Sequence, residues 1–136
     1  MGDRANVVIK ETYQEKTNYV FLYTHWRGQY LPHLVQAALQ RRLRWDDEYY
    51  LARIIFDGMT DGEQGEETGF GIGTTIRDNQ HKLIVVDPEN MCIGFTVGND
   101  YVWDTCMDTV LEDVQSWWSF GEYCDLTIEE IRKAYE

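Results

Sequence analysis

The feature that most constrains this chain is a short apolar run without alternation, Leu83–Val86 (LIVV). A strand with one face in solvent alternates apolar and polar residues, whereas a strand covered on both faces has no need to. The run therefore predicts a central strand with packed layers on both sides. The runs Gly69–Ile76 and Met91–Val97 flank it across short turns, and the three together predict an antiparallel meander.

Two further β-rich runs open the chain, Ala5–Lys10 and Tyr19–His25. The polar stretch Glu11–Asn18 joins them, so we expect a hairpin with a rather long loop.

Two amphipathic helices are expected next. The first begins near Gln29–Leu31 with Pro32 in its first turn, and the second begins at the cap candidates Asp46 and Asp47. Their apolar stripes are Leu31, Leu34, Val35, Ala38 and Leu39 in the first, and Ala52, Ile55, Phe56 and Met59 in the second.

The last third of the chain allows two interpretations. Helical spacing of its apolar residues predicts a helix over Tyr101–Trp118, with Cys106 in the buried stripe. The alternative is a helix that ends near Asp113, followed by a strand over Val114–Ser119. Capping-box pairs at Ser119 and Thr127 predict a short turn and a terminal helix to Tyr135.

The order of these elements is ββααβββαα. It predicts an α+β fold in which helices pack on an antiparallel sheet of about five strands. The chain of 136 residues is expected to form a single domain over residues 1–136, with a more acidic helical part from about residue 98.

Charge is distributed unevenly along the chain, which has a net charge of −12. Residues 1–56 carry eight basic and six acidic side chains, whereas residues 57–136 carry four basic and eighteen acidic ones. Such a chain repels nucleic acid and anionic lipid at long range, so neither is an expected partner. The acidity serves either solubility or the binding of a protein with a basic surface.

The expected location is the cytoplasm. The three cysteines, an odd number without paired spacing, are typical of a reducing compartment. No run approaches the roughly 18 apolar residues of a membrane-spanning helix, and the N-terminus lacks the apolar core of a signal peptide.

An acidic row is the candidate partner-binding surface. Asp100, Asp104 and Asp108 are four residues apart, and Glu112 continues the spacing, so all would line one face of the expected helix. The alternative is an ordinary solvated face. No metal site and no cofactor are predicted, since the histidines and cysteines have no close pairing.

The segment Tyr23–Gly28 is the candidate ligand site. His25 is titratable, Trp26 offers a stacking surface, and Arg27 suits a bidentate contact with phosphate near the start of a helix. Arg4 and Arg53 are further candidates, together with Glu67 and Thr68. One alternative is that Trp26 packs in the core and His25 caps a sheet edge. Another is that Arg4 or, more so, Arg53 pairs with a carboxylate such as Asp3 or Asp47. If the site cleaved its ligand, His25 and Glu67 would be the acid and base.

Three alternating glycines, Gly69, Gly71 and Gly73, lie within a predicted strand. A phosphate-binding fingerprint requires its glycines between a strand and a helix. These glycines are instead expected to leave room on one strand face for a bulky neighbour or a close backbone.

No cysteine has a histidine beside it in the sequence, so a cysteine enzyme is not expected.

Several stretches of roughly the first 90 residues resemble a group of small proteins known mainly from bacteriophages and some bacteria. They are MGDRANV, LYTHWRG, RWDDEYYLARIIF, ETGFGI and IVVD, whereas Gly98–Gln115 departs from the group. The resemblance implies a bacteriophage origin and no particular activity. It marks as shared positions Asp3, Arg4, Asn6, His25, Trp26, Arg27, Arg53, Glu67 and Thr68.

Three functions remain open at this point. The first is a non-enzymatic accessory protein that acts on host or defence machinery in the host cytoplasm through its acidic surface. The second is binding or sequestering of a nucleotide or nucleotide-derived signal by the Arg4, His25, Trp26 and Arg27 group. The third is a structural or assembly protein that forms a homo-oligomer by burying its aromatic tail against another copy of itself. The aromatic residues of this tail are Trp103, Trp117, Trp118 and Tyr123. Whether any catalysis occurs is left open.

Overall fold

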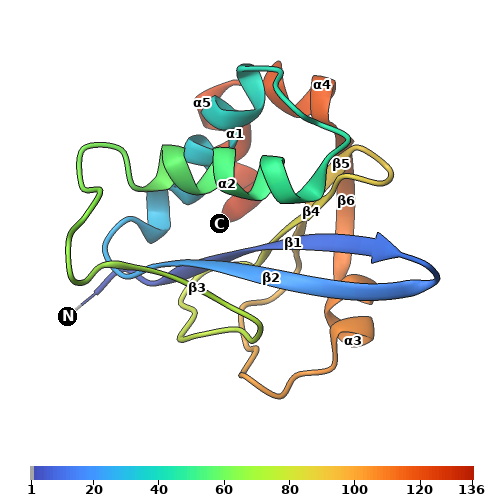
Figure 1. Cartoon of the computed structure of the whole chain (residues 1–136), viewed down its shortest axis with the longest axis horizontal. Coiled ribbons are helices and arrows are strands. Elements are labelled where there is room, and N and C mark those ends of the chain that lie inside the picture. Colours follow the sequence, from blue (N-terminus) through green and yellow to red (C-terminus); the bar gives the residue numbers. More distant parts are fainter. Residues whose placement is uncertain (1) are drawn as a thin grey trace.

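A six-stranded sheet with helices packed on it forms the fold, as a computed structural model describing residues 2–136 shows (Figure 1). The predicted α+β class is confirmed. The strands are β1 (Ala5–Tyr13), β2 (Lys16–Thr24), β3 (Phe70–Gly73), β4 (Ile84–Asp87), β5 (Cys92–Thr96) and β6 (Val114–Ser119). The helices are the 3-10 turn η1 (Gly28–Tyr30), α1 (Leu31–Gln40), α2 (Glu48–Met59), α3 (Met107–Glu112), α4 (Phe120–Cys124) and α5 (Ile128–Tyr135).

The strand order is β3-β2-β1-β4-β5-β6. β1 and β4 run parallel, with Val8 opposite Val85, and every other pair is antiparallel. β4 is buried along its whole length between two neighbours, as its unbroken apolar run predicted.

The expected meander is wrong at its first strand, because β3 pairs with β2 and not with β4. The physical reason is composition. β3 reads Phe-Gly-Ile-Gly and has few side chains to bury on two faces, so it takes an edge, whereas Leu83–Val86 needs two covered faces and lies beside β1.

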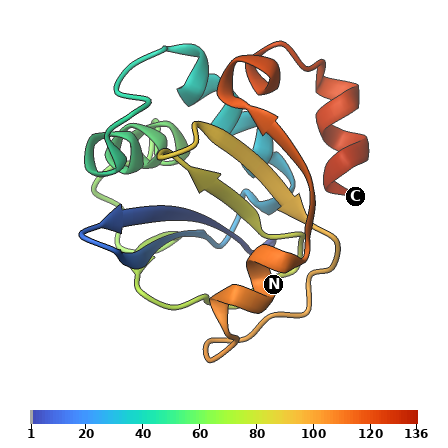
Figure 2. The same ribbon diagram turned by 90° about the vertical axis from the view of Figure 1, so that its right-hand side faces the viewer.

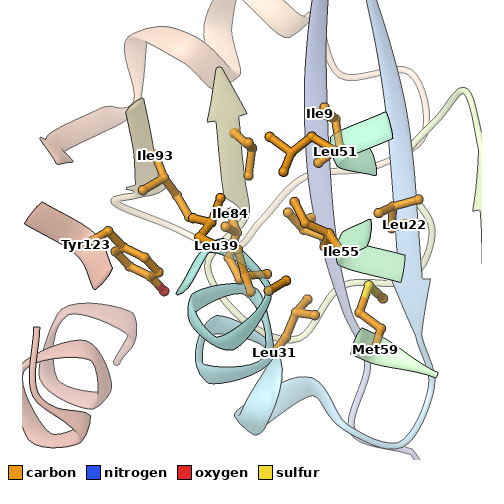
Figure 3. Packing of buried hydrophobic residues seen from close by; sticks show 14 of the residues in the cluster. Ile9, Leu22, Leu31, Leu39, Leu51, Ile55, Met59, Ile84, Ile93 and Tyr123 are labelled. Carbon is orange, nitrogen blue, oxygen red and sulfur yellow. The ribbon is translucent and has the colours of Figure 1, made fainter. Parts of the chain in front are cut away.

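One face of the sheet carries α1, α2, α4 and α5, and this layer holds the larger core. In Figure 3, Leu51, Ile55 and Met59 of α2 point toward Ile9 and Leu22 of the hairpin. The buried stripe of α2 is therefore rotated from the predicted one, and Ala52 and Phe56 are only partly buried. Each fully buried aliphatic side chain of this kind contributes about 1.5–3 kcal/mol.

The opposite face is covered by α3 and the loops around it. Its smaller core includes Val8, Phe21, Leu83, Val85, Ile76, Tyr101, Val110 and Val114. Figure 2 shows β4, β5 and β6 side by side, with α3 joined to the lower end of β6.

The predicted helix over Tyr101–Trp118 is wrong, and the alternative strand is confirmed as β6. Val102 and Thr105 close a turn through two mutual hydrogen bonds, which delays the helix until Met107. Val114–Ser119 then satisfies its backbone by pairing with the edge of β5. Cys106, expected in a buried stripe, is exposed.

Caps fix several helix ends as the sequence predicted. Ser119 and Thr127 each form a complete capping box, and Asp47 caps α2 by accepting from the amides of Tyr49 and Tyr50. None of the helices within residues 2–136 has the length and apolar character to cross a membrane.

Candidate functional site

A cleft of about 500 Å³ opens beside the β2–β3 edge of the sheet. Residues that line it are Tyr23, His25, Trp26, Thr68, Gly69, Phe70, Gly71, Ile72, Gly73, Thr75 and Arg77. Gly71 lies opposite Tyr23 and Gly73 opposite Phe21, so both glycines belong to the sheet face that carries α3.

Neither glycine is required by the fold itself. A Cβ on Gly71 would meet only the Tyr23 ring, at 4.0 Å, and one on Gly73 only the carbonyl oxygen of Thr75, at 3.9 Å. Both are ordinary van der Waals separations, and neither residue has a left-handed φ. A glycine inside a strand costs roughly 0.5–1 kcal/mol relative to alanine. What the pair provides is open space on the floor of the cleft.

Gly69 differs from its two neighbours. Its φ is +102°, and a Cβ there would come within 3.0 Å of the Trp26 indole. The indole thus lies directly over this glycine and is 51% exposed. The alternative that Trp26 packs in the core is therefore wrong. Its ring meets that of His25 edge-on, with 4.2 Å between centroids and 80° between planes.

The polar side chains of Tyr23, His25 and Arg4 contact one another beside Trp26. The Tyr23 hydroxyl lies 2.9 Å from His25 Nδ1, and Arg4 Nε donates to the same nitrogen at 3.4 Å. Because a guanidinium can only donate, Nδ1 accepts in its contact with Arg4. Burial raises the pKa of Tyr23 and outweighs the opposing charge of Arg4, so its hydroxyl keeps its proton.

A wider depression of about 870 Å³ continues from the cleft and shares Tyr23, Thr75 and Arg77 with it. Arg4 and Trp103 also border it, as do Asp78 and Asp100. Within residues 2–136, neither Arg4 nor Arg77 has an ion-pair partner. Two arginines without a carboxylate partner therefore line this depression.

The N-terminal segment holds the loop that carries Arg77. The fully buried amide of Asn6 accepts from the backbone N–H of Arg77 and donates to its carbonyl, each at 3.2 Å. Arg4 and Gln80 exchange two further hydrogen bonds, at 2.7 and 2.9 Å. Asp3 contacts His81 Nε2 at 2.6 Å and accepts from the amide of Gln29 at 2.8 Å. Asp3 and Asn6 thus have a structural role.

The structure gathers only part of the predicted ligand group. Arg4, His25, Trp26 and Thr68 border the two connected hollows. Arg27 instead pairs with Glu63, donates to the carbonyl of Met59 at 3.3 Å and lies over the Phe70 ring. Arg27 thus connects the loop that contains Glu63 to the end of α2. It is not among the residues that line the cleft.

Arg53 and Glu67 also lie outside the hollows. Arg53 forms a 2.7 Å ion pair with Asp57 on the exposed side of α2, so its partner is neither Asp3 nor Asp47. Glu67 is exposed and does not line the cleft beside His25.

The predicted acidic row is wrong as a helical face. Asp100 and Asp104 lie in the loop before α3, and only Asp108 and Glu112 are on the helix. All four are exposed, and Trp103 between the first two is 71% exposed. No group of three or more potential metal ligands comes together in the described part of the chain.

Sequence reasoning missed Arg77 as a site residue, and it included Tyr23 in the candidate segment without giving it a role. Arg77 is the first charged residue after the nine uncharged residues Thr68–Ile76, and Tyr23 shares the strand face of His25 by alternation. Those two signals were available, but the pairing of β3 with β2 was needed to bring them together. Comparisons with protein-family models, curated proteins and solved structures found no match, and the resemblance to a bacteriophage group stays a prediction.

Proposed function

We propose that this protein binds a small ligand that combines a planar ring with an anionic group, of which a nucleotide is the simplest example. The observation that carries the proposal is one cleft with three unusual features. It has a half-exposed indole, a floor of two glycines that the fold does not require, and access to two arginines without ion-pair partners. These cations occur in a chain with a net charge of −12.

The arrangement favours a ligand with two different ends. A ring that lies over Gly71 and Gly73 reaches the indole of Trp26, and stacking of a base on an aromatic side chain contributes about 1–3 kcal/mol. An anion in the adjoining depression reaches Arg4 and Arg77, whose planar groups suit bidentate contacts with phosphate. The role is binding or sequestering, because the two residues expected to act as acid and base are not brought together.

Calorimetric titration with adenosine monophosphate tests the proposal. Trp26→Ala is expected to weaken binding at least about tenfold, the lower end of the stacking contribution. Arg77→Ala is expected to weaken binding and to reduce its dependence on salt. The matched control is Trp117→Ala, which removes a 41% exposed tryptophan at the opposite edge of the sheet.

Two results would contradict the proposal. One is the absence of binding for the monophosphates of all four common nucleosides. The other is an affinity that Trp26→Ala and Trp117→Ala change equally, since a general loss of tryptophan surface would then explain it.

A second candidate function is the binding of a basic protein partner through the acidic loop before α3. The supporting observation is Trp103, which stands exposed between Asp100 and Asp104 as an aromatic anchor with a charged rim. A partner recovered from a bacterial lysate should be lost both with Trp103→Ala and with lysine at Asp100, Asp104 and Asp108. Retention of that partner by both variants would exclude this surface.

A further inference from the structure

A second exposed tryptophan borders the connected hollows, away from Trp26. Trp103 lines the wider depression and is 71% exposed, whereas Trp26 lines the cleft and not the depression. The residues common to both hollows are Tyr23, Thr75 and Arg77, which mark the junction where the cleft meets the depression. Each of the two hollows therefore has its own aromatic surface.

The turn that carries Trp103 is fixed by hydrogen bonds. The N–H of Val102 donates to the Thr105 hydroxyl at 2.8 Å, and the N–H of Thr105 donates to the Val102 carbonyl at 2.9 Å. The residue before this turn, Tyr101, is buried in the smaller core and donates from its hydroxyl to Asp113 at 2.9 Å. A tryptophan on a turn held in this way suits stacking on a ring, because the turn has little conformational freedom left to lose on binding.

The cations of the site belong to the junction. Arg77 lines both hollows, and Arg4, which borders the depression, reaches His25 of the cleft through a 3.4 Å hydrogen bond. Asp78 and Asp100 line the depression as well. A carboxylate repels phosphate but accepts hydrogen bonds from the hydroxyls of a sugar. The mixture of charges therefore suits a ligand whose phosphates are flanked by sugars.

We propose that the two hollows together bind a dinucleotide, with one base on Trp26 and the second base on Trp103. Its two phosphates lie between the bases, at Arg4 and Arg77. The inference rests on the proposed function, because it adds a second base to the ligand of the same site. The order aromatic, cationic, aromatic along the hollows is the order base, phosphates, base along such a ligand.

The size of the hollows agrees with this assignment. Pockets for drug-sized ligands measure roughly 300–1,000 Å³. The cleft of about 500 Å³ and the depression of about 870 Å³ each lie within that range. A mononucleotide on Trp26 would leave the second tryptophan uncovered, whereas a dinucleotide uses both hollows.

Calorimetric titration of the full chain with three matched ligands tests this inference. The first is adenosine monophosphate, the second is diadenosine diphosphate, which joins two such units through their phosphates, and the third is cyclic di-adenosine monophosphate. All three carry a charge of about −2 near neutral pH, so a gain in affinity reflects the second base and not charge. We expect a dinucleotide to bind with one ligand per chain, at least about fivefold tighter than the monophosphate. The linkage that gives the gain shows whether the ligand is linear or cyclic.

Variants of the second tryptophan assign the gain to its source. Trp103→Ala is expected to remove the gain and to leave the affinity for adenosine monophosphate unchanged, because only the second base contacts this residue. Trp103→Phe keeps an aromatic ring and should retain most of the gain. The matched control is Val102→Ala, which shortens a 57% exposed neighbour that lines the same depression and should not change the gain.

The outcomes separate this inference from the proposed function. If adenosine monophosphate binds and neither dinucleotide binds more tightly, the inference is overturned and the proposed function stands. A gain that survives in Trp103→Ala also overturns the inference alone, since the second base would then lie elsewhere. Absence of binding by both dinucleotides and by the monophosphates of all four common nucleosides contradicts both.

Discussion

Alanine is expected to have opposite effects at different glycines, three in the sheet and one directly before β3. The comparison tests whether the two glycines of the cleft floor serve the fold or a ligand. At Gly71 and Gly73 a methyl group finds ordinary van der Waals distances. Alanine there reduces the conformational freedom of the unfolded chain, so each change should raise the free energy of unfolding by about 0.4–1 kcal/mol.

Gly94 and Gly69 should respond in the other direction. A Cβ on Gly94 of β5 would meet the Val114 side chain and approach the Ser116 carbonyl oxygen to 2.7 Å. Alanine at this position overpacks the β5–β6 contact and should cost about 1–3 kcal/mol. At Gly69 the left-handed φ and the overlying indole make alanine unfavourable by about 1–2 kcal/mol.

Thermal unfolding followed by calorimetry measures these differences. For a chain of 136 residues the unfolding entropy is about 0.29 kcal/mol/K, so 1 kcal/mol corresponds to about 3.5 °C in Tm. Gly71→Ala and Gly73→Ala should each raise Tm by about 1–4 °C, and Gly94→Ala should lower it by about 4–10 °C.

Binding completes the test. A methyl group on the cleft floor lifts a ring away from Gly71, so the two stabilised variants should bind adenosine monophosphate at least about tenfold more weakly. If Gly71→Ala and Gly73→Ala destabilise the protein as much as Gly94→Ala does, the glycines serve the fold and the reasoning is refuted.

Two further predictions concern stability. Asn6→Ala should cost about 2–4 kcal/mol, because it leaves backbone groups of the Arg77 loop without partners, and chemical denaturation measures this. Burial raises the pKa of both Tyr123 and Tyr135, so above about pH 10 the unfolded chain loses protons that the folded chain keeps. The contribution of these two tyrosines to stability should be constant below that pH and should fall above it by about 1.4 kcal/mol per pH unit for each tyrosine. The slope of stability against pH above about pH 10 should be smaller in Tyr135→Phe, and an unchanged slope in this variant would contradict the assignment.

Local signals predicted the elements of this fold well. The capping boxes, the Asp47 cap and the unbroken apolar run of β4 each depend on residues a few positions apart, and each formed as expected. The strand β6 was harder to predict because Val114–Ser119 also fits helical spacing. The free edge of β5 decided between the two, since pairing there satisfies the backbone of the segment.

The candidate site follows the same division. His25 and Trp26 are adjacent in sequence and were identified as a group, whereas Arg77 joins them only because β3 leaves the expected meander and pairs with β2. That choice depends on which strand offers enough apolar side chain to fill both faces beside β1, and Phe-Gly-Ile-Gly does not. The glycines that keep β3 out of the centre of the sheet are therefore the ones that open the cleft at its edge. This links the topology and the proposed binding site to one property of the sequence.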